Sequence, residues 1–166
     1  VAGRIYQLEG RDIPYFAVAD GNNGVNINKP NIGMPTSNLV CASWNPDLAY
    51  QVGRVIAEEA RENNVQMILA PAMNLHRNPL CGRHPEYFSE DPLLGGIMAG
   101  NQCKGLEENG VSASIKHVCC NNAESSRKRN HSIVSQRALR ELYLRTFEVA
   151  FDIHIPDSIM TGYNAC

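Results

Sequence analysis

Short apolar runs alternate with longer amphipathic segments along the chain, and this alternation predicts its secondary structure. Buried strands are expected where apolar or small residues run together before a turn signal, at 13–19, 65–70, 111–118 and 158–161. A further short apolar run at 39–44 also favours a strand. The pattern therefore provides several short strands spread over the whole chain.

Amphipathic helices are expected between these strands. Asn45-Pro46 and Asp91-Pro92 each place a capping side chain directly before a proline. Apolar residues at helical spacing follow both pairs, so helices are predicted over 46–63 and from 92 to about 109. Ser135 is a good N-cap for a third helix, whose apolar face extends to Phe151. Polar loops separate the elements, at 21–35, 72–91 and 121–132.

Strands that alternate with helices predict a parallel α/β sheet. Right-handed crossovers place the carboxyl ends of all parallel strands at one edge, where both barrel and open α/β folds bind ligands. Polar residues follow the predicted strands at Asp20, in the 72–91 loop, at Lys116-His117 and at Tyr163. These side chains are therefore expected to converge at a common rim.

Length and composition restrict the class of protein. The 166 residues are 43% hydrophobic with a net charge of −2, which fits one soluble domain and excludes a wholly disordered chain. No basic stripe is present to attract nucleic acid, and no apolar run approaches the ~20 residues of a membrane span. The start, Val1 to Arg4, lacks both an initiator Met and a signal-peptide apolar region. Six cysteines without a C-x-x-C pair favour reduced thiols, so a cytoplasmic location is expected.

Several kinds of functional site have no support. The sequence contains no G-x-G-x-x-G, no P-loop and no G-x-S-x-G motif, which argues against a dinucleotide site, a phosphate loop and a nucleophile elbow. A zinc site built from His76, Cys81 and His84 would lack a second ligand pair of regular spacing. We expect neither a metal nor an organic cofactor.

The predicted rim carries a mixture of groups that suits a sugar. Asp20 can accept hydrogen bonds from neighbouring hydroxyls, Arg83 and Lys116 donate, and His117 can do either. Tyr163 adds a flat aromatic face with a hydroxyl. Sugars present many hydroxyls around an apolar ring face, so these residues together favour a carbohydrate site.

Each residue also has a purely structural interpretation. Asp20 could belong to a simple turn, Lys116 could be solvated beside a hydrogen-bonded His117, and Arg83 could pair with a glutamate of its own loop. Tyr163 could be half-buried, and Trp44 is expected in the core. The 89–92 segment is interpreted as helix-start chemistry rather than a catalytic carboxylate cluster. The expected convergence at one rim favours the functional interpretation.

Five segments of the chain resemble glycoside hydrolase family 3, and within it the β-glucosidases: Ala19-Asp-Gly-Asn-Asn-Gly24, Pro71-Ala-Met-Asn-Leu-His-Arg-Asn-Pro-Leu-Cys-Gly-Arg83, Glu86-Tyr-Phe-Ser-Glu-Asp-Pro92, Lys116-His117 and Ile159-Met-Thr-Gly-Tyr-Asn164. The resemblance runs in order from about residue 12 to the end. It implies that residues 1–166 are the first half of a (β/α)8 TIM-type barrel domain, because a complete barrel needs ~250 residues. The later strands and a second domain would lie outside the chain, on the same polypeptide or a second chain.

The resemblance also implies a reaction and its substrate. A complete enzyme of this branch would be a retaining, exo-acting β-glucosidase that removes terminal β-D-glucosyl residues from β-glucosides or short β-glucan oligosaccharides by double displacement. The implied substrate-binding residues are Asp20, Arg83, Lys116, His117, Arg127 and Tyr163. The nucleophile aspartate and the acid/base glutamate would lie outside this chain, so this segment alone is predicted to be inactive.

Some alternatives remain open from the sequence. After Lys116-His117 the chain continues with Val118-Cys119-Cys120 and lacks the Gly- and Asp-containing segment of the family's histidine acid/base branch, so a β-N-acetylglucosaminidase mechanism is not supported. The chain could be a non-catalytic sugar-binding or structural half-domain that needs a partner segment. It could also belong to a β-xylosidase-type exo-glycosidase of the same family. The adjacent cysteines have no explanation at this level.

Overall fold

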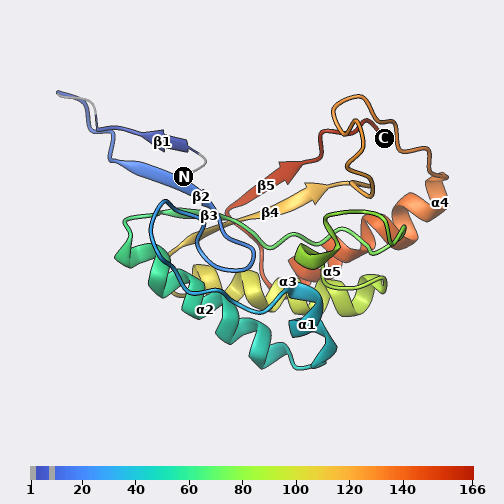
Figure 1. The fold of residues 1–166 in the computed structure, drawn as a ribbon, viewed down its shortest axis with the longest axis horizontal. Helices are drawn as coiled ribbons and strands as arrows, with labels where there is room; N and C mark the ends of the chain where they lie inside the picture. Colours follow the sequence, from blue (N-terminus) through green and yellow to red (C-terminus); the bar gives the residue numbers. More distant parts are fainter. Residues whose placement is uncertain (1–2, 8–9) are drawn as a thin grey trace.

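A computed structural model of the chain describes residues 3–7 and 10–166. In these residues one five-stranded sheet has the order β1-β2-β3-β4-β5 (Figure 1). Strands β2 to β5 run parallel, whereas β1 is antiparallel to β2. Their bounds are Gly3–Ile5, Phe16–Asp20, Met67–Leu69, Ser112–Val118 and Ser158–Thr161. The predicted α/β half-barrel is confirmed, with the antiparallel strand β1 as an addition that the pattern missed.

Helices α1 (Ser37–Ala42), α2 (Pro46–Glu62), α3 (Pro92–Glu107) and α5 (Arg145–Ile153) lie on one side of the sheet (Figure 1). Two of them begin at the predicted caps. The Asn45 side chain accepts hydrogen bonds from the first-turn amides of α2, and the Asp91 side chain accepts one from the Leu94 amide at 2.8 Å. The prolines at the first helical positions need no amide partner, so both starts follow from local sequence.

The helix predicted after Ser135 is interrupted. The Ser135 side chain accepts from the Ala138 amide at 3.1 Å, as expected of an N-cap. The chain forms a short α4 (Gln136–Ala138), and a π-helical turn over Leu139–Tyr143 follows it. Helix α5 begins after this turn. In the loop before α3, one 3-10 turn spans His84–Glu86.

The helices pack closely enough that their backbones nearly touch. Helix α3 lies between α2 and α5. A Cβ atom at Gly53 of α2 would lie 2.2 Å from the Gln102 carbonyl oxygen, and one at Gly105 of α3 would lie 2.1 Å from the Tyr50 carbonyl oxygen. Glycine is therefore required at both crossing positions, because any side chain would push the two backbones apart.

Two expectations around residue 40 are wrong. The run at 39–44 is not a strand, because Ser37, Val40 and Cys41 are buried while Leu39 is exposed, which is the 3–4-residue period of a helix. Trp44, expected in the core, is 74% exposed at the turn between α1 and α2. The backbone φ of Trp44 is +53°, in the left-handed region, so the chain turns at this residue.

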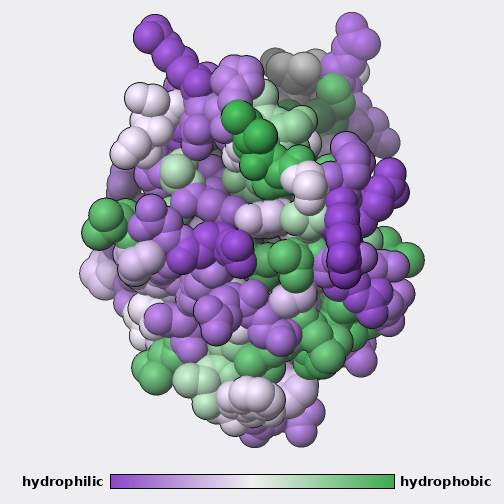
Figure 2. All heavy atoms as spheres, turned by 90° about the vertical axis from the view of Figure 1, so that its right-hand side faces the viewer, coloured by the Kyte–Doolittle hydropathy of each residue, from purple (hydrophilic) through white to green (hydrophobic). Residues whose placement is uncertain are grey.

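The carboxyl ends of β4 and β5 point to the right in Figure 1, and Figure 2 views the molecule from that end. This end is covered mainly by hydrophilic residues, with hydrophobic ones between them. Within the part of the chain that the structure describes, none of the helices combines the length and apolar character that crossing a membrane requires.

Candidate functional site

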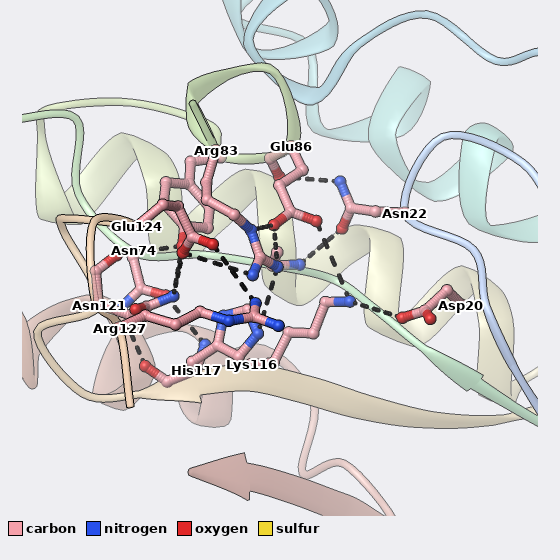
Figure 3. A network of polar contacts seen from close by, with 12 residues as sticks. Asp20, Asn22, Asn74, Arg83, Glu86, Lys116, His117, Asn121, Glu124 and Arg127 are labelled. Carbon is pink, nitrogen blue, oxygen red and sulfur yellow. Dashed lines mark hydrogen bonds and ion pairs between the residues drawn. The ribbon is translucent and has the colours of Figure 1, made fainter. Parts of the chain in front are cut away.

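The residues predicted at the rim come from separate strand ends and do meet. Asp20 is the last residue of β2, and Lys116 and His117 lie in β4 just before its end. Lys116 Nζ donates to Asp20 Oδ1 at 3.1 Å and lies 4.0 Å from Glu86 Oε2 (Figure 3). The Lys116 side chain is only 5% exposed, whereas that of Asp20 is 53% exposed. A buried ammonium therefore lies between two carboxylates, one of which faces solvent.

Arg83 brings the long 71–91 loop onto the same network. Its guanidinium forms a hydrogen-bonded ion pair with Glu86, lies 3.6 Å from Glu124 Oε1 and approaches His117 Nε2 at 3.3 Å (Figure 3). The expected pairing of Arg83 with a glutamate of its own loop is confirmed. The same Arg83 side chain also reaches His117 on β4. Its pairing within the loop is therefore compatible with a place in the candidate site.

His117 is held neutral. Its pKa is lowered from 6.5 to about 3, first by burial and then by the charges of Arg83, Lys116 and Arg127. A guanidinium can only donate, so His117 Nε2 accepts from Arg83 and the ring proton resides on Nδ1. Nδ1 is buried and has no hydrogen-bond partner among residues 3–7 and 10–166. The site thus contains a buried donor that no described residue satisfies.

Arg127 and Tyr163 form the outer part of the same rim. Arg127 Nη1 donates to Glu124 Oε2 at 3.3 Å, and its guanidinium lies 4.9 Å from the centre of the Tyr163 ring. Lys128 lies 5.6 Å from the same ring. Tyr163 is 61% exposed, so the half-buried interpretation is wrong and the ring remains partly accessible. The six predicted residues therefore form one connected set, through Glu86 and Glu124.

Asparagines that the sequence reasoning missed hold this set in place. Asn74 Nδ2 donates to the His117 carbonyl at 2.9 Å, and its Oδ1 accepts from the His117 amide at 3.0 Å. Asn22 accepts from the Ala72 amide at 2.6 Å and donates to the Glu86 carbonyl at 2.8 Å. Both are buried and both lie in the loops that follow parallel strands, Asn22 after β2 and Asn74 after β3, which is the signal that could have identified them. Glu124 had no comparable signal, because it lies in an irregular loop.

The surface near this network is hollowed on the side of the 121–132 loop. A cavity of about 380 Å³ is lined by Glu124, Ser126, Arg127, Lys128 and Arg129. A larger hollow of about 540 Å³ lies near β1 and shares no residue with the network. We place the candidate site at the rim, because several charged side chains from separate strands and loops converge there, among them the buried Lys116.

The zinc site considered from the sequence does not form. His76 Nε2 lies 3.0 Å from the His84 carbonyl and 3.1 Å from the Tyr87 carbonyl, and the two imidazole rings stack with centres 4.5 Å apart. His76 Nε2 is thus used as a donor to the backbone. In the described ranges, the side chains that could hold a metal form two other groups, Cys119-Cys120-Cys166 and Cys103-Glu107-His154.

Comparisons with known proteins agree with this architecture. The family model of the glycosyl hydrolase family 3 N terminal domain matches residues 4–166. Beta-glucosidase A of Butyrivibrio fibrisolvens is 42% identical over 157 residues, and probable beta-glucosidase I of Aspergillus fumigatus is 42% identical over 158 residues. Each match covers 92% of this chain and 19% of the relative. The chain thus spans about a fifth of the length of these relatives.

Solved structures are equally similar. Beta-glucosidase 3B from Thermotoga neapolitana, in complex with glucose, has a TM-score of 0.95 at 44% identity over 99% of this chain and 24% of its own. The GH3 beta-glucosidase of Bifidobacterium adolescentis has a TM-score of 0.93 at 40% identity, over 98% of this chain and 24% of its own. Both structures therefore share the fold of this chain over nearly its whole length.

Proposed function

The chain belongs to glycosyl hydrolase family 3, and on this basis we propose that it is the sugar-binding part of a retaining, exo-acting β-glucosidase. Residues 1–166 would form the N-terminal part of the barrel domain, completed by the remainder of the polypeptide or by a second chain. Its substrates would be β-glucosides or short β-glucan oligosaccharides. The names of the relatives and the glucose complex of the Thermotoga neapolitana enzyme support this assignment.

The observation that carries the proposal is the Asp20–Lys116 pair at the carboxyl edge of the sheet. The two side chains present an anionic acceptor and a cationic donor 3.1 Å apart, with the Asp20 side chain more than half exposed. Two neighbouring hydroxyls of a sugar ring can each donate to the carboxylate and accept from a cation, and such charge-assisted bonds are stronger than neutral ones. The buried ammonium is already oriented before a sugar arrives, which lowers the entropic cost of binding.

Arg83 and His117 would belong to the same sugar-binding site as Asp20 and Lys116. Burial first, and then the charge of Arg83, keeps His117 neutral, and the proton on Nδ1 lacks a partner in the described part of the chain. Because Nδ1 is buried, a group from the rest of the barrel would satisfy this donor. Arg127 would fix the 121–132 loop through Glu124, and the partly exposed Tyr163 ring would provide an apolar wall.

We propose that the two catalytic carboxylates lie outside these 166 residues. A retaining glycosidase needs a nucleophile and an acid/base about 5–5.5 Å apart. The rim carboxylates Asp20, Glu86 and Glu124 each contact a lysine or arginine. A carboxylate that is paired in this way is suited to orienting its cation and a sugar hydroxyl, and we propose this role for the three rim carboxylates. The cytoplasmic location stays a prediction that rests on the cysteine pattern.

The central test is the substitution Lys116→Met in the polypeptide at its natural length. It preserves the length of the side chain but removes the charge, so we expect KM for an aryl β-D-glucoside to rise and kcat/KM to fall at least tenfold, about 1.4 kcal/mol. The matched control is Lys104→Met, because Lys104 lies on α3 in a solvent-exposed pair with Glu108. Unchanged kinetics in Lys116→Met, with an unchanged melting temperature, would contradict the proposed role.

A second measurement tests whether these 166 residues catalyse the reaction without the rest of the polypeptide. The 166-residue chain, assayed by itself, is expected to give no turnover of an aryl β-D-glucoside, while the complete polypeptide is active. Turnover by the chain alone would show that the catalytic carboxylates lie within it. An aryl β-D-xyloside assayed in parallel distinguishes the β-glucosidase from the β-xylosidase alternative.

A further inference from the structure

Three cysteine thiols meet beside the rim, outside the sugar-binding network. Cys119 and Cys120 directly follow β4, and Cys166 follows β5. Cys119 Sγ lies 3.3 Å from Cys166 Sγ and 3.7 Å from Cys120 Sγ. All three sulfur atoms lie within 4.8 Å of one another, and all three cysteines are free. Neither the fold nor the proposed reaction requires such a cluster.

The backbone accounts for this convergence. Side chains of consecutive residues in extended backbone point to opposite sides. Cys120 has a φ of +60°, a left-handed conformation that interrupts this alternation and allows its thiol to approach that of Cys119. The Cys120 carbonyl accepts from Ser132 Oγ at 2.9 Å, which ties this turn to the following loop.

The segment that carries Cys166 is held to the same place. Asn164 Nδ2 donates to the Cys119 carbonyl at 3.0 Å, and the Ala165 amide donates to the Asn130 carbonyl at 3.1 Å. Cys166 itself is exposed, while Cys119 and Cys120 are buried. The two segments are therefore aligned by hydrogen bonds that do not involve sulfur.

We propose that Cys119, Cys120 and Cys166 form a binding site for one thiophilic metal ion, with Zn²⁺ as the ion that fits best. Zinc–sulfur bonds of about 2.3 Å in a tetrahedral arrangement place neighbouring sulfurs about 3.8 Å apart. The sulfur–sulfur distances of 3.3 and 3.7 Å are near this value and the third pair lies within 4.8 Å, so movements of about 1 Å suffice. Three sulfur ligands and no oxygen ligand select against Mg²⁺ and Ca²⁺.

Binding requires no electron transfer. Three S–H bonds break, three Zn–S bonds form, and three protons pass to solvent, while zinc remains divalent. The three cysteines would fill three of the four tetrahedral positions, which leaves the fourth for a water molecule or a further ligand. The bound ion would link the segment after β4, which follows His117, to the segment after β5, which contains Tyr163.

The other group of potential ligands serves as a contrast. Glu107 accepts from the Ala113 and Asp157 amides at 3.0 and 2.8 Å and lies 2.7 Å from His154 Nε2. Its carboxylate therefore already ties together α3, β4 and the segment before β5. Because these bonds would have to break for a metal to enter, we assign no metal to Cys103, Glu107 and His154.

The test is a titration of the polypeptide at its natural length with Co²⁺ and then Zn²⁺, under reducing and oxygen-free conditions. We expect one equivalent of Co²⁺ to produce a thiolate-to-cobalt charge-transfer band, and Zn²⁺ to displace it with release of protons. Cys166→Ser should weaken the affinity at least about tenfold, because it removes one ligand at an exposed position. Cys81→Ser is the matched control and should leave the affinity unchanged.

Other results would overturn the proposal. These are the absence of a thiolate band in the unmodified protein, an equal band in the Cys119→Ser/Cys166→Ser double variant, or an equal loss in the Cys81→Ser control. As a second readout, Zn²⁺ should raise the melting temperature of the unmodified protein but not that of Cys166→Ser. Both measurements are independent of glycosidase turnover, so failure here leaves the proposed function intact.

Discussion

The helical layer and the rim of the sheet are built on opposite principles. Helices α2, α3 and α5 gain their stability from buried apolar surface and from backbones in close contact at glycines. The rim instead buries a lysine and a histidine and compensates them with carboxylates and asparagine side chains. Polar burial of this kind costs stability unless every partner is present. We infer that the helical layer stabilises the domain, while the rim gives up some stability in order to bind a ligand.

The largest expected effect is in the helical layer. Gly105→Ala places a Cβ 2.1 Å from the Tyr50 carbonyl oxygen, and a backbone atom cannot rotate away. We expect the free energy of unfolding to fall by about 3 kcal/mol, measured by urea denaturation. Gly33→Ala is the control, because a Cβ at Gly33 meets nothing within 4 Å. Equal stability of the two variants would show that the helices can separate without cost.

The next effect concerns the rim and depends on pH. His117 has a folded-state pKa of about 3 against 6.5 when unfolded, so folding favours its neutral form. The contribution of neutral His117 to the free energy of unfolding is fully present above pH 6.5 and is lost as the pH falls toward 3. At pH 5 the loss amounts to about 2 kcal/mol. Urea denaturation at pH 7.5 and pH 5 measures this loss. His117→Gln should lose less between the two pH values, and an unchanged pH dependence would contradict a neutral buried His117.

A smaller effect separates function from stability at the rim. Asp20→Asn removes the charge that faces Lys116 but keeps the shape of the side chain. We expect kcat/KM for an aryl β-D-glucoside to fall about tenfold, with a change in unfolding free energy of at most about 1 kcal/mol, because Asp20 is exposed and Lys116 keeps Glu86 at 4.0 Å as a partner. Asp152→Asn, at an exposed position of α5, is the control. A loss of unfolding free energy in Asp20→Asn without a loss of kcat/KM would contradict the inference that the rim serves ligand binding rather than stability.

The smallest effect returns to the helical layer. Asn45→Ala removes the acceptor for the Asp47 amide at the start of α2 and should cost about 1 kcal/mol in urea denaturation. Asn45→Asp should retain most of the stability, because a carboxylate can cap the same amides. Activity is expected to be unchanged in both variants. A change in KM would indicate that α2 is coupled to the rim.

The helical layer could be predicted well because its signals are local. The caps at Asn45 and Asp91 and the apolar spacing after them define the starts of α2 and α3 without knowledge of the rest of the chain. The segment 39–44 was misassigned because a short apolar run suits a strand and a helix equally, and only its burial pattern distinguishes them. β1 was missed because its three residues are all exposed.

The rim could be predicted only in part. Topology alone brings Asp20 and Lys116 together, since both lie at the carboxyl ends of parallel strands. The contacts of Glu124 depend on the path of an irregular loop, which no periodicity specifies. Trp44 was misplaced because hydrophobicity favours the core, whereas this residue lies in the turn between α1 and α2. Sequence thus indicated which strand ends meet and, through the family resemblance, the loop residues Arg83 and Arg127, but not the glutamates that link them.

Strand β1 restricts how a closed barrel can be wound from this sheet. It occupies the outer edge of β2 in the reversed direction, with Gly3 opposite Val18 and Ile5 opposite Phe16. Because β1 already occupies this edge of β2, eight identical strand–helix units cannot close a barrel there. A barrel completed from this sheet would therefore contain one strand that runs in the opposite direction.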